Sequence, residues 1–344
     1  MKRKLSIHDI AKELNVSSTT VSFVINGKAA EKRISSDMEK KILHYINKVG
    51  YQPNMMAKSL RTGKSKIIGL MVENMYDPFF SSIARIIEEN TYQLGYKIFH
   101  SSTDNDTLKS KDLIKAFRER QVDGYIIAPA PGIENDIQQL IDDGIPVIQF
   151  DRYLSKLKTD VIVIDNMDGA FIGVQHLVEN GYKMIAFVTL DSLQVQMMDR
   201  LAGYKKALQK FGLKKYVLNI PYGTESDVST EMIKDFISNN PGLDALFFAT
   251  NYLAISGLKA IKDLQMNVPG QMGVVGFDDN THFALFSPSI TAIAQPIKEI
   301  SDEVVRSLIN CLAERDNKNR KPEKVELKVT LNIRESSQRN SLNH

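Results

Sequence analysis

The sequence of 344 residues contains a single cysteine, Cys311, which rules out an intramolecular disulfide and a cysteine-based metal site. No apolar run approaches the roughly 18 residues of a membrane-spanning helix, and there is no low-complexity tract. The six histidines are scattered, and hydrolase and zinc patterns such as G-x-S-x-G and H-E-x-x-H are missing. These absences exclude disulfide-rich and membrane-spanning proteins and give metal or hydrolase sites little support.

The overall composition, 43% hydrophobic and 25% charged, is typical of a soluble globular protein, and the length suits two or three domains. The N-terminal residues Met-Lys-Arg-Lys lead into a capped helix and not into the apolar core of a signal peptide. We therefore expect a cytoplasmic protein, and this argues against an exported, transport-type binding protein.

Positive charge is concentrated at the N-terminus. Residues 1–66 contain 14 Lys or Arg against 5 Asp or Glu, out of 44 and 41 in the whole chain, so this part carries +9 and the remainder −6. A basic head on an acidic body indicates that the head alone binds a polyanion.

Within this basic head, residues 6–26 predict two short helices joined by a tight turn. Ser6 and Asp9 form a capping box for the first helix, which we expect to run from Ile7 to about Leu14. Ser17 caps the second helix, which starts one residue later. The alternative is a helical hairpin with no role in nucleic-acid binding, and the surrounding positive charge argues against it.

The second helix is predicted to be a recognition helix for the DNA major groove. Its apolar side chains face the first helix and leave Ser18, Thr19 and Phe23 pointing outward, where we expect them to read base edges. The residues assigned to phosphate contacts are His8, Ser17, Thr20, Ser22 and Asn26.

A third helix is expected to start at Ser36, with Glu39 completing a second capping box, and to end at Gly50. A short helical segment rich in Lys and Arg follows, and it is either a plain linker or a hinge that inserts into the minor groove. In the second case Ala57 and Leu60 contact DNA, and the hinge requires a dimer.

From Lys66 onward, short apolar runs alternate with amphipathic helices, which predicts an α/β fold with parallel sheets. Two successive sets of similar size indicate two similar lobes, and a late strand, Val325–Ile333, joins a sheet. The predicted divisions are a DNA-binding domain at 1–52, a hinge at 53–64, a core at 65–335 and a disordered tail at 336–344. The first lobe comprises about 65–165 and 294–324, and the second about 166–293 and 325–335.

The residues in these segments resemble the lactose-repressor family of bacterial transcription factors over almost the whole chain. The resemblance implies a helix-turn-helix head, a hinge helix and a two-lobed core similar to periplasmic sugar-binding proteins. It further implies a homodimer, palindromic operator DNA and a small-molecule effector held between the lobes. The motifs that carry it are Ile10-Ala11, Val16-Ser17, Thr20-Val21-Ser22, Asn26-Gly27, Gly50-Tyr51-Gln-Pro-Asn54, Ala57-Lys-Ser-Leu-Arg-Thr-Gly63, Ile68-Gly69-Leu70, Asp77-Pro-Phe-Phe80, Gly276-Phe-Asp278 and Gln295-Pro-Ile297.

Two positions depart from the family pattern. Phe23 stands where the recognition helix usually carries arginine, so an apolar contact replaces a guanine contact and the operator sequence does not transfer. Asn251-Tyr252 stands where an Asn-Asp pair is usual, so the identity of the effector does not transfer either.

The effector site is predicted from the strand ends, because ligands of open parallel sheets bind beyond the carboxyl ends of the strands. We expect Arg200 to start a helix that faces the cleft. Carboxylates facing the ligand favour a neutral sugar over a sugar phosphate. The predicted effector residues are Phe79, Phe80, Asp151, Arg152, Arg200, Tyr222, Asn251 and Asp278.

Each of these residues also has a purely structural interpretation. Asp151 and Arg152 are alternatively a surface ion pair, Asp278 a helix cap, Phe80 a core residue, and Arg200 a partner of Asp199. Taken together, the residues combine carboxylate, amide and guanidinium groups with aromatic faces, which suits binding of a sugar ring.

These observations predict a sequence-specific DNA-binding repressor that needs no cofactor and is controlled by a small molecule, which we expect to be a sugar. We expect it not to be an enzyme. The alternative is an αβ enzyme with a DNA-binding head that acts on a sugar or phosphate in the same cleft. A poised acid/base pair would favour the enzyme, and plain hydrogen-bond clamps would favour the sensor.

Overall fold

The computed structural model describes residues 5–51, 63–315, 317 and 320–339. The chain divides into two compact units, residues 1–65 and 66–344. The predicted hinge residues Ala57 and Leu60 lie outside the described residues, so each unit is considered by itself.

The first unit is a three-helix domain. Ser6 and Asp9 form the predicted capping box, in which the Asp9 carboxylate accepts from the Ser6 backbone N–H at 2.8 Å. Ser17 caps the second helix by accepting from the Thr20 N–H at 2.9 Å, as predicted. The helices are α1 (Ile7–Glu13), α2 (Ser18–Ile25) and α3 (Ser36–Val49).

The predicted capping box of α3 is wrong. The helix starts at Ser36 as expected, but the capping residue is Ser35, whose hydroxyl accepts from the Met38 N–H at 3.4 Å. The third residue of the helix is therefore Met38, and Glu39 forms no capping box. The helix ends at Gly50, whose φ of 63° is the left-handed conformation that glycine adopts without strain.

The second unit contains two six-stranded sheets with the same strand order, one in each lobe. All neighbouring strands pair in parallel except β12 with β10. The first sheet runs β11 (Lys324–Leu327), β5 (Asp160–Ile164), β4 (Val147–Phe150), β3 (Gly124–Ile127), β1 (Ile67–Val72) and β2 (Lys97–Ser102). The second runs β12 (Thr330–Asn332), β10 (Thr291–Ala294), β9 (Gly273–Phe277), β8 (Ala245–Phe248), β6 (Ile185–Asp191) and β7 (Tyr216–Pro221).

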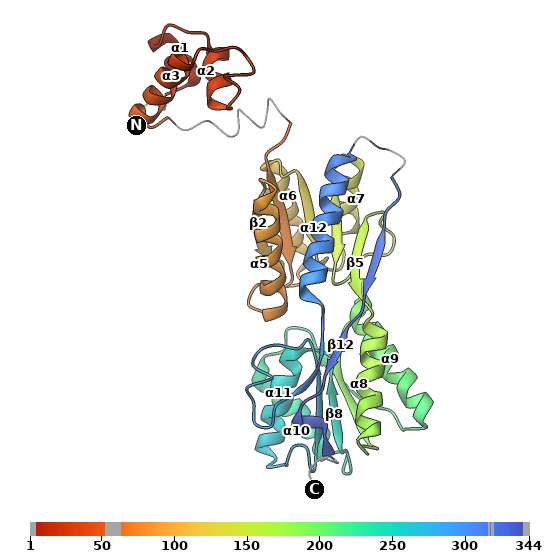
Figure 1. The fold of residues 1–344 in the computed structure, drawn as a ribbon. Helices are drawn as coiled ribbons and strands as arrows, with labels where there is room; N and C mark the ends of the chain where they lie inside the picture. Colours follow the sequence, from red (N-terminus) through yellow and green to blue (C-terminus); the bar gives the residue numbers. More distant parts are fainter. Residues whose placement is uncertain (1–4, 52–62, 316, 318–319, 340–344) are drawn as a thin grey trace. The chain divides into compact units, whose positions relative to one another are not determined.

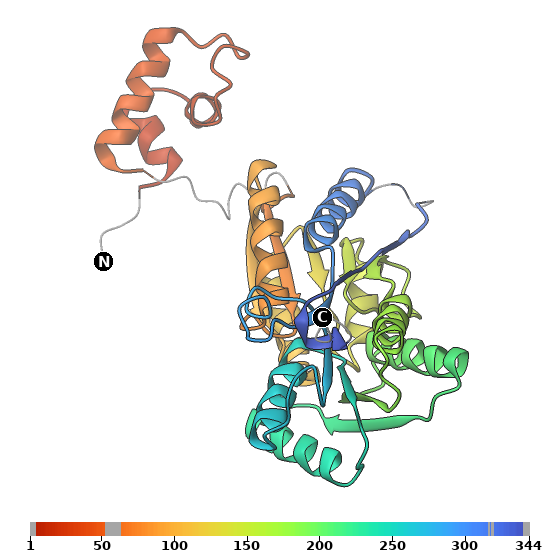
Figure 2. The same cartoon turned by 60° about the horizontal axis from the view of Figure 1, so that its bottom comes forward.

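Helices cover both faces of each sheet (Figures 1 and 2). Because successive strand residues point to opposite faces, Leu70 packs into one hydrophobic core and Met71 into another. The helices of the first lobe are α5 (Pro78–Gln93), α6 (Thr107–Glu119), α7 (Glu134–Asp142) and α12 (Ile297–Ala313). Those of the second are α8 (Asn166–Glu179), α9 (Val195–Phe211), α10 (Ser226–Ser238), α11 (Asn251–Asp263) and the 3-10 helix η1 (Glu335–Ser337).

The chain passes between the lobes three times, from β5 to α8, from β10 to α12 and from β11 to β12. The third passage corrects the prediction of one strand over Val325–Ile333. That segment forms two strands, β11 in the first sheet and β12 in the second, so residues 324–327 belong to the first lobe. Lys328, in this passage, pairs with Asp165, in the first passage, at 2.8 Å.

The predicted disordered tail is wrong for residues 336–339, while 340–344 lie outside the described residues. Ser336 and Ser337 are fully buried against the second sheet. The Ser336 hydroxyl donates to the Val274 carbonyl at 2.7 Å, and the Ser337 hydroxyl lies 2.8 Å from His176 Nε2. The end of the described chain therefore completes the second lobe.

Candidate functional site

The outward face of α2 brings together most of the residues assigned to DNA contacts. Val21 and Val24 are buried in the core of the head, which fixes the orientation of the helix. Thr19 is exposed at its first turn. His8 Nδ1 lies 2.7 Å from the Ser18 hydroxyl, so this hydrogen bond ties α1 to the start of α2.

The other residues of this face are held by local hydrogen bonds. Ser17 and Thr20 share a hydrogen bond of 2.8 Å between their hydroxyls. The Asn26 amide donates to the Ser22 carbonyl at 2.6 Å. Phe23 is half-buried, with the Lys32 ammonium 5.6 Å from its ring centroid, so an apolar surface stands beside a positive charge.

The cleft between the two lobes of the second unit is built around two strand ends that occupy equivalent places in the two sheets. Asp151 follows β4, and Asp278 follows β9. Both have positive φ, 64° and 65°, a conformation that is uncommon for a residue other than glycine. Strained backbone of this kind clusters at binding sites.

Arg152 is the fixed cation of the first lobe. It is 3% exposed and donates to the Pro129 carbonyl at 2.8 Å. It also donates to Glu73 at 2.8 Å and to Asp151 at 3.1 Å. Asp151 and Arg152 therefore do form an ion pair, but it is buried and not on the surface.

Arg200 is the fixed cation of the second lobe and is 2% exposed. It donates to Asn166 at 2.9 Å, to the Ala249 carbonyl at 2.6 Å and to Asp278 at 3.1 Å. Its guanidinium carbon lies 3.7 Å from the centroid of the Phe277 ring. The partner of Arg200 is therefore Asp278 and not Asp199.

The prediction that Arg200 starts a helix is wrong. Arg200 lies in the second turn of α9, which begins at Val195. The apolar pattern of the sequence predicts a helix only from Leu201, because the polar residues Gln196 and Asp199 interrupt that pattern in the preceding residues. Asp278 does not cap a helix either, since it accepts from Arg200 and from the Gln295 amide at 2.5 Å.

The remaining predicted residues surround the same cleft. Phe79 and Phe80 line it and also belong to the core, where Phe80 contacts Phe150 edge to face. Asn251 is 5% exposed and hydrogen-bonds to Asp77. The Tyr222 hydroxyl donates to Glu73 at 3.0 Å. Phe80 is thus both a core residue and part of the cleft wall.

The prediction missed several cleft residues that the same strand-end rule would have found. Glu73 and Asp77 follow β1, Gln194 and Gln196 follow β6, and Gln295 follows β10. Applying the rule to every strand would have included them. Tyr252, which departs from the family pattern, also lines the cavity.

Burial raises the pKa of two cleft carboxyl groups to about 6. For Asp77, burial is the main cause, and the nearby Asp278 and Glu73 charges raise the pKa further. For Asp151, burial is again the main cause, opposed by Arg152 and Arg200. Ionising these groups is therefore costly unless a donor from a ligand compensates it.

The cavity enclosed by these side chains measures about 40 Å³ and lies between two hollows of about 550 and 540 Å³. Ligand sites usually measure roughly 300–1,000 Å³. The inner cavity is thus smaller than such a site, whereas each of the two hollows that adjoin it has that size.

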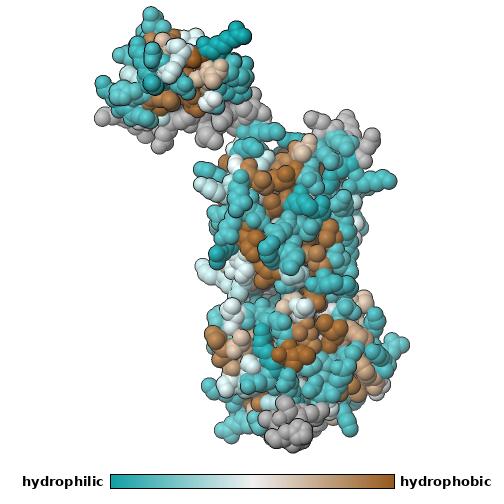
Figure 3. Space-filling model, in the orientation of Figure 1, coloured by the Kyte–Doolittle hydropathy of each residue, from teal (hydrophilic) through white to brown (hydrophobic). Residues whose placement is uncertain are grey.

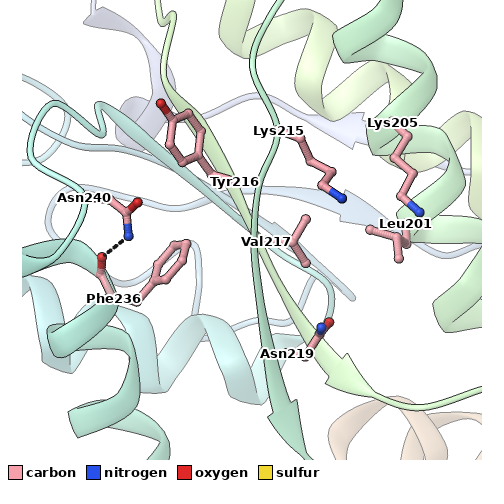
Figure 4. Close-up of a pocket in the computed structure, with 8 residues that line it drawn as sticks. All are labelled: Leu201, Lys205, Lys215, Tyr216, Val217, Asn219, Phe236 and Asn240. Carbon is pink, nitrogen blue, oxygen red and sulfur yellow. Dashed lines mark hydrogen bonds between the residues drawn. The ribbon is translucent and has the colours of Figure 1, made fainter.

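A separate hollow of about 540 Å³ lies beside the edge strand β7 (Figure 4). Figure 4 shows Lys205 and Lys215 on one side of the strand and Phe236 and Asn240 on the other. None of the predicted effector residues lines it, and it has no carboxylate. The cleft is therefore the better candidate for the effector site.

Neither a membrane-crossing helix nor a metal-binding cluster is found in the described residues. No helix in them is long and apolar enough to cross a bilayer. Nor do they contain a group of three or more His, Cys, Asp or Glu side chains suitable for a metal.

Comparison with known proteins identifies the family. Residues 6–54 match the model for bacterial regulatory proteins of the lacI family, and residues 174–337 match a periplasmic binding protein-like domain. The HTH-type transcriptional regulator RegA of Clostridium saccharobutylicum is 30% identical over 315 residues, covering 90% of this chain and 93% of RegA. The chain belongs to the LacI family of bacterial regulatory proteins.

Solved structures share the fold of this LacI-family chain. The lac repressor dimer bound to operator and the anti-inducer ONPF superposes with a TM-score of 0.83 at 21% identity, covering 97% of this chain and 99% of that one. The transcriptional regulator CelR in complex with cellobiose has a TM-score of 0.69 at 22% identity, covering 96% and 99%. The predicted fold class is thus confirmed.

The family membership makes this protein a DNA-binding transcriptional regulator with a helix-turn-helix head and an effector-binding core. RegA and the HTH-type transcriptional repressor PurR of Mannheimia succiniciproducens, which is 27% identical over 334 residues, are named as transcriptional regulators, and these names give the alternative of an enzyme no support.

Proposed function

We propose that this LacI-family regulator is a cytoplasmic repressor that binds a palindromic operator as a homodimer. A sugar bound in the cleft changes its affinity for that operator.

This proposal rests on one observation, which is that the side chains of the cleft come from both lobes. Asp151 and Arg152 come from the first lobe, whereas Arg200 and Asp278 come from the second. A ligand that contacts all four holds the two lobes in one arrangement. Because it binds that arrangement better than others, it shifts the equilibrium between conformations and thereby the binding of DNA.

The chemistry of the cleft supports a neutral sugar over a sugar phosphate. Carboxylates and guanidinium groups hydrogen-bond to hydroxyls, and the aromatic faces of Phe79 and Phe80 suit a sugar ring. The carboxylates would repel a phosphate. The fold neighbour CelR is described as a complex with cellobiose, a neutral disaccharide.

In the head, we assign Ser18, Thr19 and Phe23 to base edges, and the polar residues around them to phosphates. The phosphate group comprises His8, Ser17, Thr20, Ser22 and Asn26. Ala57 and Leu60, outside the described residues, are assigned to the minor groove.

Exposed apolar side chains of the core support a dimer. Tyr76 is 95% exposed, Tyr92 74% and Leu285 81%. Hydrophobic side chains also reach the surface of both lobes on the face drawn in Figure 3. Apolar side chains that gather in a patch, as in Figure 3, mark an interaction surface, whereas single exposed ones do not.

The test is operator selection from genomic DNA with the full chain, followed by fluorescence anisotropy on the enriched site with and without a panel of sugars. We expect one enriched palindrome and a sugar that changes its Kd by about 5–150-fold. Enrichment of no specific sequence, or of a site whose affinity no sugar changes, would contradict the proposal.

A further inference from the structure

Six charged side chains line the inner cavity of the cleft, and their charges do not balance. Four are carboxylates and two are guanidinium groups, so the fully ionised set has a net charge of −2. They are Glu73, Asp77, Asp151, Asp278, Arg152 and Arg200.

Both cations are already committed to protein partners. Arg152 and Arg200 each donate to a backbone carbonyl and to at least one carboxylate. Both are almost completely buried, so neither is free to move toward a ligand anion. An anionic ligand would therefore meet the excess negative charge without a free cation to receive it.

Asp77 is the carboxylate that lacks a cation. In the part of the chain that the structure describes, no Lys, Arg or His side chain forms an ion pair with it. Its carboxylate caps α5 by accepting from the Phe79 N–H at 2.7 Å, and it hydrogen-bonds to Asn251. Two charged neighbours that raise its pKa, Asp278 and Glu73, are both negative.

A second, independent feature of the cavity also requires a donor. Gln196 is 4% exposed and lines the cavity, and its side-chain oxygen has no hydrogen-bond partner among the described residues. Its amide nitrogen lies 3.4 Å from the side-chain oxygen of Gln194. A buried acceptor without a partner destabilises the fold, and a donor from a ligand removes that cost.

We propose that the effector carries a protonated amine, as amino sugars do, with the ammonium group beside Asp77 and hydroxyl donors directed at Gln196. This inference rests on the proposed function, in which the cleft holds a sugar without a phosphate, and it changes that sugar from neutral to cationic. An ammonium group offers three donors and no acceptor, which complements a cavity rich in acceptors. Its positive charge offsets part of the excess negative charge.

The experiment is isothermal titration calorimetry on the full chain with glucosamine, galactosamine and mannosamine. Each is compared with its neutral parent sugar, its N-acetyl derivative and its 6-phosphate. The N-acetyl derivative keeps the ring and the nitrogen but loses the charge. We expect one amino sugar to bind about tenfold or more tightly than its uncharged counterparts, because a hydrogen bond between two charged groups is stronger than one between neutral groups.

Two variants test whether the preference for an amino sugar depends on the charge of Asp77. Asp77→Asn removes the charge and retains a side chain that caps helices well. It should weaken binding of the amino sugar about tenfold more than binding of the neutral parent. The matched control is Asp106→Asn, which changes the cap of α6 in the same lobe, where Asp106 accepts from the Lys109 N–H at 2.6 Å outside the cleft lining. This control should bind as wild type does.

The outcomes separate the inference from the function on which it rests. If the neutral parent or the phosphate binds as tightly as the amino sugar, or if Asp77→Asn weakens charged and neutral sugars equally, the amine is excluded while control by a sugar stands. If no sugar of any class binds or changes operator affinity, both proposals fail.

Discussion

Replacing Arg200 by methionine removes the cation at the centre of the second lobe's part of the cleft. Methionine fills much of the same volume but donates no hydrogen bond. The change leaves Asp278 without its ion pair and deprives Asn166 and the Ala249 carbonyl of their donor. It also removes the contact of the guanidinium with the Phe277 ring.

The size of the effect follows from burial. Arg200 is 2% exposed, so water cannot replace the lost donors. Breaking a buried ion pair by removing one partner costs about 3–5 kcal/mol. For a unit of this size, such a loss lowers Tm by on the order of 10 °C.

The assay is thermal and urea unfolding of wild type, Arg200→Met, Asp278→Leu and the double variant. The double variant has no unpaired charge at this position, so it should recover most of the loss. The matched control is Arg85→Met, since Arg85 makes an exposed ion pair with Glu89 on α5 and should leave the midpoint unchanged.

Two results would refute this reasoning. One is a midpoint for Arg200→Met within error of wild type, which would mean that the ion pair is not buried in solution. The other is a double variant as unstable as the sum of the single variants, which would mean that the two side chains act independently.

Three further predictions concern the head, the cleft and the chain end. Phe23→Ala should change operator preference by about 1–3 kcal/mol at one base pair in binding assays, and an equal loss on every sequence would contradict base reading. Asp77 and Asp151 have pKa values of about 6 in the folded state, against 3.8 for an unperturbed aspartate. Their protonation therefore stabilises the folded state fully below pH 3.8, and this stabilisation is lost as the pH rises through 6. The midpoint of urea unfolding should therefore increase from pH 7 to pH 5, and less so in Asp77→Asn. Ending the chain at residue 334 removes the buried Ser336 and Ser337 and should lower Tm by several degrees in a thermal melt; an unchanged Tm would show that they contribute nothing.

The head was predictable because its signals are local. The capping box at Ser6 and the cap at Ser17 depend on residues three positions apart, and the helical spacing of apolar residues defines one buried face. The error at α3 arose because Ser35 and Ser36 are both good caps, and the sequence alone does not distinguish them.

The fold class of the core was predictable from the sequence, but the pairing of its last strands and of its buried charges was not. Apolar and polar side chains alternate without a break over residues 325–333, as they would in a single strand, and only the positions of β5 and β10 in space divide this segment between two sheets. The strand-end rule found Asp151 and Asp278. It could not show that Arg200 pairs with Asp278, because that contact depends on where α9 lies in the second lobe relative to the end of β9.

The division of the last strands between the sheets also bears on synthesis of the protein. The strands β1 to β5 leave the ribosome first, yet their sheet is completed by β11, which follows all of the second lobe except β12 and η1. A nascent chain therefore exposes the edge of β5 while the second lobe is translated. Both lobes acquire their final edge strands within a few residues of each other, so the complete core forms only after β12 has been synthesised.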